Sequence, residues 1–343
     1  MNQLAVLSGL AALVAPVPWA YAGFLLLVVF FLALDLGVFH REARVVGIRE
    51  AITWSLVWIG TALAFTVVIF LAYERHWLDL GIDVPQLDGT IAPLVGGSEA
   101  ARLFLTGYLI EKSLSMDNLF VIALIFGYFA TPAIYQHRVL FWGILGALVM
   151  RGGIIAVGAV LLHRFAWIIY VFGGFLVLTA VKMAVTRSEG IDPGKNWLIR
   201  LTRRVWPVTD RYDGARFFTR VGGRRAATPL FLALIMVEFT DLVFAVDSIP
   251  AIFAITADPF LVFTSNVFAI LGLRALYFCL ADLIPRFRYL KTALIGVLFF
   301  VGGKMLLVKT AWKVDPTVSL LVVAGILIAG VVASLVTARA STE

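Results

Sequence analysis

Residues 238–256 read "EFTDLVFAVDSIPAIFAIT", a stretch that is apolar enough for a membrane yet holds Glu238, Asp241 and Asp247. A charged side chain at the centre of a bilayer costs about 2.5–3.5 kcal/mol on insertion scales, so acidic residues at that depth usually have a function. The stretch therefore predicts a membrane helix that carries hard oxygen ligands.

The whole chain has the composition of a membrane protein. Of its 343 residues, 62% are hydrophobic and 14% are charged, whereas soluble domains carry about 25% charged residues. Apolar runs of roughly 20 residues, long enough to cross about 30 Å of hydrocarbon, occur nine times in the sequence. We predict an all-α polytopic membrane protein with about nine transmembrane helices, near 20–39, 52–74, 101–127, 138–162, 167–186, 229–256, 262–283, 289–310 and 317–337.

The 28 Lys and Arg residues are distributed unevenly between the connecting segments. If the first span runs from outside to inside, most of them fall in cytoplasmic segments, above all in a basic loop at 187–228. The outer segments hold Arg75, Arg164, Lys309 and Lys313. This positive-inside pattern predicts an outer N-terminus and a cytoplasmic C-terminus. The net charge of +7 therefore reports orientation and contact with lipid, and we expect no nucleic acid partner.

The two acidic segments belong to an internal repeat. Placing "EKSLSMDNLFVIA" (111–123) over "DLVFAVDSIPAIF" (241–253) aligns two acids at the same spacing, and further matches follow in order. The repeat pairs Glu111 with Asp241, Asp117 with Asp247, Asn118 with Ser248, Arg151 with Arg274, and Lys182 with Lys304. We expect 101–186 and 229–310 to be two copies of a three-helix unit. Because three is odd, the copies enter the membrane from opposite sides, as in transporters whose site lies near the midplane.

The remaining segments complete the predicted organisation. Residues 1–100 form an N-terminal tail, two accessory helices and an outer loop. Residues 311–343 form the last helix and a cytoplasmic tail. A homo-oligomer is compatible with this arrangement.

Candidate metal ligands lie on the first helix of each unit. On a straight helix, Asp117 and Asp247 point about 120° away from the partner acids of their motifs, so we expect these helices to bend or unwind. Pro250 lacks an N–H and frees the carbonyl of Val246 beside Asp247. Such oxygen ligands suit Mg²⁺, Ca²⁺ or Mn²⁺. The predicted site comprises Glu111, Asp117, Asn118, Glu238, Asp241, Asp247 and Ser248.

Basic residues inside the spans are candidates for balancing these acids. They are Lys112, Arg151, Lys182, Arg274 and Lys304. An alternative interpretation is that acids and bases only pair with one another and hold the bundle together. The concentration of the acids on two repeat-related helices, beside amide and hydroxyl oxygens, favours a cation site over scattered pairs.

Other chemistry has little support in the sequence. The single Cys279 excludes thiolate cages and disulfide frameworks within one chain. The four histidines fall at predicted helix ends or loops, and no common hydrolase or nucleotide-binding motif is present. We therefore expect neither an enzyme nor a resident cofactor. Glycine pairs at 173–174 and 302–303 predict close helix packing.

Four stretches resemble the TerC family of integral membrane proteins. They are "LALDLGVFHR" (32–41), "EKSLSMDNLFVIALIF" (111–126), "HRVLFWGILGALVMR" (137–151) and "EFTDLVFAVDSIPAIFAIT" (238–256). The chain is most similar to the Alx-type branch, which the family associates with manganese export, and the family is grouped with LysE-type exporters. The resemblance implies Mn²⁺ efflux across the bacterial inner membrane, with ligands at Glu111, Asp117, Asn118, Asp241, Asp247 and Ser248.

Two functions follow as hypotheses. The first is a divalent-cation exporter that works by alternating access at a midplane carboxylate site and exchanges the metal for protons. The second is a membrane scaffold of the tellurium-resistance response that docks partners through the basic loop at 187–228 and transports nothing.

Overall fold

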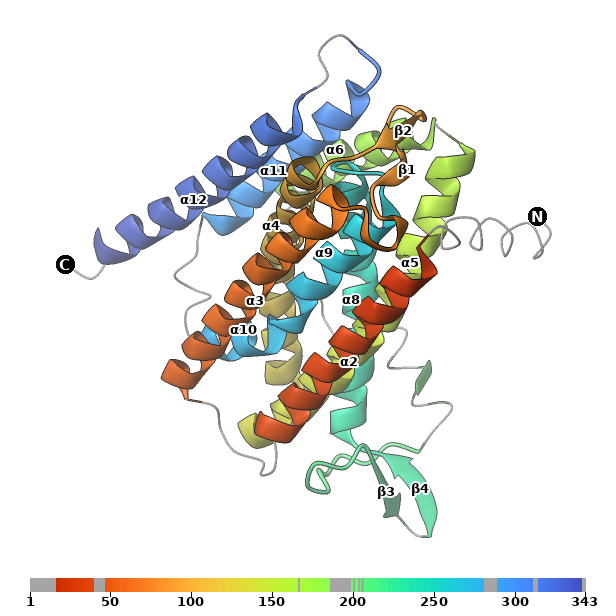
Figure 1. The fold of residues 1–343 in the computed structure, drawn as a ribbon. Coiled ribbons are helices and arrows are strands. Elements are labelled where there is room, and N and C mark those ends of the chain that lie inside the picture. The colour runs from red at the N-terminus through yellow and green to blue at the C-terminus, as the bar shows by residue number, and fades with distance from the viewer. Residues whose placement is uncertain are drawn as a thin grey trace.

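The computed structural model describes most of the chain as a helical bundle (Figure 1). The described residues are 17–39, 47–165, 167–185, 199, 201–202, 204, 207–221, 223–280, 289–310 and 314–340. Within these ranges, the side chains of residues 35–39, 117, 120, 163, 247, 280, 290, 335 and 338–340 are not described. The predicted tail before residue 17 and about two-fifths of the basic loop at 187–228 therefore lie outside the described residues.

Long helices and two short hairpins make up this bundle. The helices are α2 (Pro18–Phe39), α3 (Ile48–Glu74), α4 (Gly97–Tyr128), α5 (Ala133–Arg164), α6 (Ile168–Val185), α8 (Pro229–Phe253), α9 (Pro259–Leu271), α10 (Leu273–Leu280), α11 (Leu290–Leu306) and α12 (Pro316–Ala340). The shorter elements are the 3-10 turn η1 (Trp77–Asp79) and strands β1 (Ile82–Pro85), β2 (Ile91–Leu94), β3 (Phe218–Val221) and β4 (Arg224–Ala227).

The described helices confirm the all-α membrane fold. Each of the nine predicted spans coincides with one helix, except that the seventh comprises α9 and α10 together. Among the described residues, six segments are long and apolar enough to cross a membrane. Of the others, α4 is long enough but carries Glu111, Lys112 and Asp117 near its middle, and α11 has 17 residues.

The contacts between the predicted repeats have a twofold pattern. Helix α4 packs on α9 in the second unit, and its repeat-related counterpart α8 packs on α5 in the first. Each helix of the first unit also contacts its predicted counterpart in the second unit: α4 contacts α8, α5 contacts α9, and α6 contacts α11. In Figure 1 the β1–β2 and β3–β4 hairpins lie at opposite ends of the bundle, so α4 and α8, which follow them, start at opposite ends. Inverted repeats require this arrangement, and the repeat relation itself stays a prediction.

The acidic helices are not unwound at the positions where a bend or an unwound turn is expected, and a bend there stays a prediction. Helix α4 is continuous through Asp117, and α8 is continuous through Pro250. Pro250 lies in the last turn of α8, and its missing N–H removes the usual helical donor to the carbonyl of Val246 although the helix continues to Phe253. The second unit is interrupted instead at Gly272, between α9 and α10. A Cβ at Gly272 would lie 3.0 Å from both Nζ of Lys112 and Cβ of Trp58.

Glycine allows α6 and α11 to pack closely against each other. A Cβ on Gly173 of α6 would lie 3.1 Å from the carbonyl oxygen of Gly302 on α11, and the reverse distance is 2.9 Å. The predicted close packing is confirmed at these two positions.

The hairpins β1–β2 and β3–β4, both antiparallel, were not predicted. Gly89 and Gly223 at their turns have φ of 85° and 79°, which glycine adopts without steric cost.

Candidate functional site

Glu111 of α4 and Asp241 of α8 meet at one buried point. Glu111 is 0% exposed and Asp241 is 9% exposed. Both contact the guanidinium of Arg151 on α5, which is 1% exposed. Nη1 of Arg151 donates to Oε1 of Glu111, while Nη2 and Nε donate to Oδ1 and Oδ2 of Asp241 at 2.8 and 3.1 Å. One arginine therefore ties together the two acids that the repeat relates.

The next polar pair of the repeat also reaches this cluster. Asn118 Nδ2 donates to Oδ1 of Asp241 at 3.1 Å, and Oγ of Ser248 lies 3.5 Å from Nη1 of Arg151. Because α4 and α8 run in opposite directions, Asn118 lies across from Asp241, and Ser248 lies beside the Arg151–Glu111 contact. The structure thus brings together four predicted ligands, Glu111, Asn118, Asp241 and Ser248, around a predicted charge-balancing residue.

Glu238 lies about one turn from Asp241 on α8, against Gly146 of α5. A Cβ at Gly146 would collide with both carboxylate oxygens of Glu238, so any larger residue there would force the end of this side chain to move. Oε2 of Glu238 has no hydrogen-bond partner among the described residues. Gly146 was not predicted as part of the site, although a glycine in the middle of a helix, which costs about 1 kcal/mol relative to alanine, was a usable signal.

Asp117 and Asp247 are the predicted ligands that the structure does not test. Their backbones lie in α4 and α8, immediately before Asn118 and Ser248. Their side chains are outside the described residues, so their role as ligands stays a prediction.

Two of the other candidate counter-ions, Lys112 and Lys304, donate to groups outside the Arg151 cluster. Lys112 Nζ donates to the carbonyl of Ala269 on α9 at 3.2 Å, and Lys304 Nζ donates to Ser319 Oγ on α12 at 3.2 Å. Lys182 is exposed on α6. Arg274 is buried directly after the Gly272 interruption. Among the described residues, Arg151 alone of these five bases contacts Glu111 or Asp241.

Several oxygens of the cluster are still available to a ligand. Oε2 of Glu111, Oγ of Ser115 and Oδ1 of Asn118 are buried and have no hydrogen-bond partner in the described part of the chain. In this arrangement, no three His, Cys, Asp or Glu side chains among those described lie close enough to hold a metal ion. The cluster therefore offers hard oxygen atoms around a protein cation, and a divalent ion would have to rearrange it.

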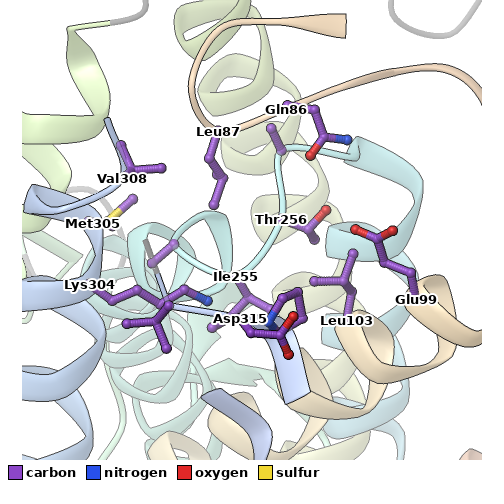
Figure 2. Close-up of a pocket in the computed structure, with 14 residues that line it drawn as sticks. Gln86, Leu87, Glu99, Leu103, Ile255, Thr256, Lys304, Met305, Val308 and Asp315 are labelled. Carbon is purple, nitrogen blue, oxygen red and sulfur yellow. The ribbon is translucent and has the colours of Figure 1, made fainter. Parts of the chain in front are cut away.

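A cavity of about 360 Å³ lies at the β1–β2 end of the bundle (Figure 2). Leu103 of α4, Ile255 after α8 and Lys304 of α11 line it, with the carboxylates of Glu99 and Asp315. Leu103 is eight residues before Glu111 and Ile255 is seven after Ser248, which corresponds to about 10–12 Å along each helix. The cavity thus lies on the side of the Arg151 cluster that faces the β1–β2 hairpin.

Comparison with known proteins finds relatives that match more than 90% of the chain. An uncharacterized membrane protein of Myxococcus xanthus, STKORF319, is 49% identical over 322 residues, which are 94% of this chain and 93% of the relative. The "Putative membrane-bound redox modulator Alx" of Escherichia coli (strain K12) is 45% identical over 312 residues, 91% of this chain and 92% of the relative. No solved structure matches the chain. The family described as "Integral membrane protein TerC family" matches residues 96–342, and the chain belongs to this family of integral membrane proteins.

Proposed function

We propose that the protein is a divalent-cation exporter, with Mn²⁺ as its main substrate, and that it works by alternating access. One observation carries this proposal: Glu111 and Asp241, from the first helices of the two predicted repeats, converge on one buried point. Inverted repeats in secondary transporters form their substrate site at such a junction. Acids that only stabilised the bundle could have paired separately, each with its own base.

The chemistry of the cluster supports a hard cation. The available groups are carboxylate, amide and hydroxyl oxygens, which are the ligands that Mn²⁺, Mg²⁺ and Ca²⁺ prefer. Glu238 adds a carboxylate next to Asp241, and Asp117 and Asp247 would complete the set if their side chains turn toward it. The choice of Mn²⁺ within this group of ions rests on the resemblance to the manganese-exporting branch of the family.

The proposed orientation places the cavity on the outer side of the membrane, and the direction of transport rests on the resemblance to the exporting branch of the family. The β3–β4 end carries Arg216, Arg220, Arg224 and Arg225, and the positive-inside pattern assigns such an end to the cytoplasm. The cavity at the β1–β2 end then opens to the outside of a bacterial plasma membrane. Carboxylates that bind metal must be deprotonated, so metal binding releases protons and loss of metal takes them up. We propose that the exporter exchanges the metal for protons in this way.

A redox role is part of the name of the relative Alx. Here the chain has one cysteine, Cys279, so a disulfide cannot form within one chain. A redox effect would instead follow from transport of a redox-active ion such as manganese.

The proposal is tested by flux in proteoliposomes loaded with a metal-sensitive dye. The wild-type protein is compared with Glu111→Gln and with Asp315→Asn, which removes a carboxylate at the edge of the outer cavity. We expect Mn²⁺ flux in the wild type, flux within about twofold of it in Asp315→Asn, and a loss of at least about tenfold in Glu111→Gln. Flux that is absent from the wild type, or unchanged in Glu111→Gln, would contradict the proposal.

The scaffold hypothesis retains one supporting observation, the folded β3–β4 hairpin with exposed arginines in the basic loop. Deleting residues 207–227 separates the two functions. If the protein is a scaffold, the deletion abolishes its cellular phenotype, and vesicles show no Mn²⁺ flux with or without the deletion. If the protein is an exporter, the deleted variant still transports Mn²⁺ in vesicles.

A further inference from the structure

Among the residues that the structure describes, Arg151 is the largest of those that are fully buried. Its guanidinium makes a bidentate contact with Asp241 and a further contact with Glu111. Planar, two-point pairing of this kind is stronger than an ordinary hydrogen bond and fixes the position of the carboxylate. Arg151 therefore occupies Oδ1 and Oδ2 of Asp241 and Oε1 of Glu111 in the state that the structure shows.

A divalent cation would need the same oxygens. Metal–oxygen bonds of Mn²⁺-like ions are about 2.1–2.4 Å long, so the ion would have to lie between the two carboxylates, where the guanidinium now lies. A divalent ion at that point would overlap the guanidinium and be repelled by its positive charge, so the two cations cannot occupy the same place between the carboxylates. Oε2 of Glu111 and Oδ1 of Asn118, which have no hydrogen-bond partner among the described side chains, offer further contacts to the ion.

The charges of the cluster show why a protein cation is useful there. Without Arg151, an empty site would leave Glu111 and Asp241 as two unpaired carboxylates in a buried environment, which is strongly unfavourable. With Arg151 in place, one of these charges is compensated when no ion is bound. A divalent ion would compensate both charges, so it can replace the arginine without leaving the two carboxylates to repel each other.

We propose that Arg151 is a tethered counter-cation of the transport cycle: it holds Glu111 and Asp241 in the empty carrier and leaves them when the divalent cation binds. This inference rests on the proposed function. It makes Arg151 a competitor of the substrate, which weakens binding and drives release. A residue that only holds α4, α5 and α8 together would not compete with the ion.

The two roles predict opposite effects on metal affinity. Mn²⁺ binding is measured by calorimetry and by metal-dependent thermal shift on the purified full-length protein. Arg151→Gln removes the competing charge, so we expect Mn²⁺ to bind at least about tenfold more tightly, as the loss of a charge-assisted pair implies. Release from this variant should be slower, so its steady-state Mn²⁺ flux should fall. Binding that is unchanged or weaker in folded Arg151→Gln would overturn the proposal.

Two further variants keep the test decisive. Arg151→Lys retains the charge but loses the two-point contact, and we expect it to bind Mn²⁺ a few-fold more tightly than the wild type. If Arg151→Gln does not fold, the lysine variant decides alone, and unchanged or weaker binding overturns the proposal. Lys182→Gln removes the same charge from an exposed position on α6 and should leave the affinity within about twofold.

The outcome for the wild type separates this inference from the proposed function. If the wild-type protein binds no Mn²⁺ and shows no flux, the proposed function fails and the role of Arg151 fails with it. If the wild type binds and transports Mn²⁺ but neither Arg151 variant binds more tightly, the exporter stands and Arg151 is a structural clamp.

Discussion

The two predicted repeats share a sequence pattern but differ in local structure. In the first unit, α5 runs unbroken from Ala133 to Arg164, and Arg151 in its middle reaches the acids. In the second unit, the corresponding segment is interrupted at Gly272, and Arg274 follows the interruption. Equivalent positions thus have different conformations in one molecule. If the proposed alternating access operates, the opposite state is expected to exchange these two conformations between the predicted units.

The largest effect is expected from a mutation of Asp241, the residue to which Arg151 makes two hydrogen bonds. We expect Asp241→Asn to abolish Mn²⁺ flux and to lower the free energy of unfolding by on the order of 3 kcal/mol, because it leaves a buried arginine with a weaker partner. Flux measurements and thermal unfolding in detergent check this. The mutation of the repeat-related acid, Glu111→Gln, should lose flux equally; retention of flux in either variant would show that the two acids are not one site.

The next largest effect is expected at the contact between α5 and Glu238. Gly146→Ala places a Cβ against the Glu238 carboxylate, and we expect a loss of stability of about 1–3 kcal/mol, as for other overpacked positions, together with reduced flux. Gly153→Ala on the same helix is the matched control, because a Cβ there meets nothing within 4 Å. Equal unfolding temperatures of the two variants would show that Glu238 moves aside freely.

The interruption of the second unit can be tested with one methyl group. Gly272→Ala would bring a Cβ within 3.0 Å of Cβ of Trp58, and we expect a cost of about 1–2 kcal/mol and a several-fold reduction of flux. Gly127→Ala, whose Cβ meets nothing within 4 Å, is the control in α4. A Gly272→Ala protein with unchanged flux would mean that transport does not depend on the shape of this interruption.

The smallest effects separate the repeat-related lysines. Lys304 is buried and bonded to Ser319, so Lys304→Gln should lower the free energy of unfolding by about 1 kcal/mol. Lys182 is exposed, and Lys182→Gln should change it by less than about 0.5 kcal/mol. The measurement is the unfolding midpoint of each variant. Equal shifts in the two midpoints would contradict the expectation that the buried lysine contributes more to stability than the exposed one.

The sequence predicted the spans well because membrane helices follow from apolar length, which is a local property. It also predicted that Glu111 and Asp241 would converge, because their equivalence was visible as a repeat. It did not distinguish Arg151 from the other four bases, since which base reaches the acids depends on the crossing of α5 with α4 and α8. It missed the β1–β2 hairpin although Asp88-Gly89 is a common hairpin turn, because the surrounding segment lacks a long alternating pattern.

The contact of Gly173 with Gly302 has a practical consequence. Because the backbones of α6 and α11 approach closely there, we expect these helices to keep their spacing during transport. Spin labels on their outward faces, for example at Leu178 and Phe299, would give a fixed internal ruler in a protein whose native Cys279 has been replaced. Distances between α4 and α9 could then be calibrated against that ruler in the same sample, with and without Mn²⁺.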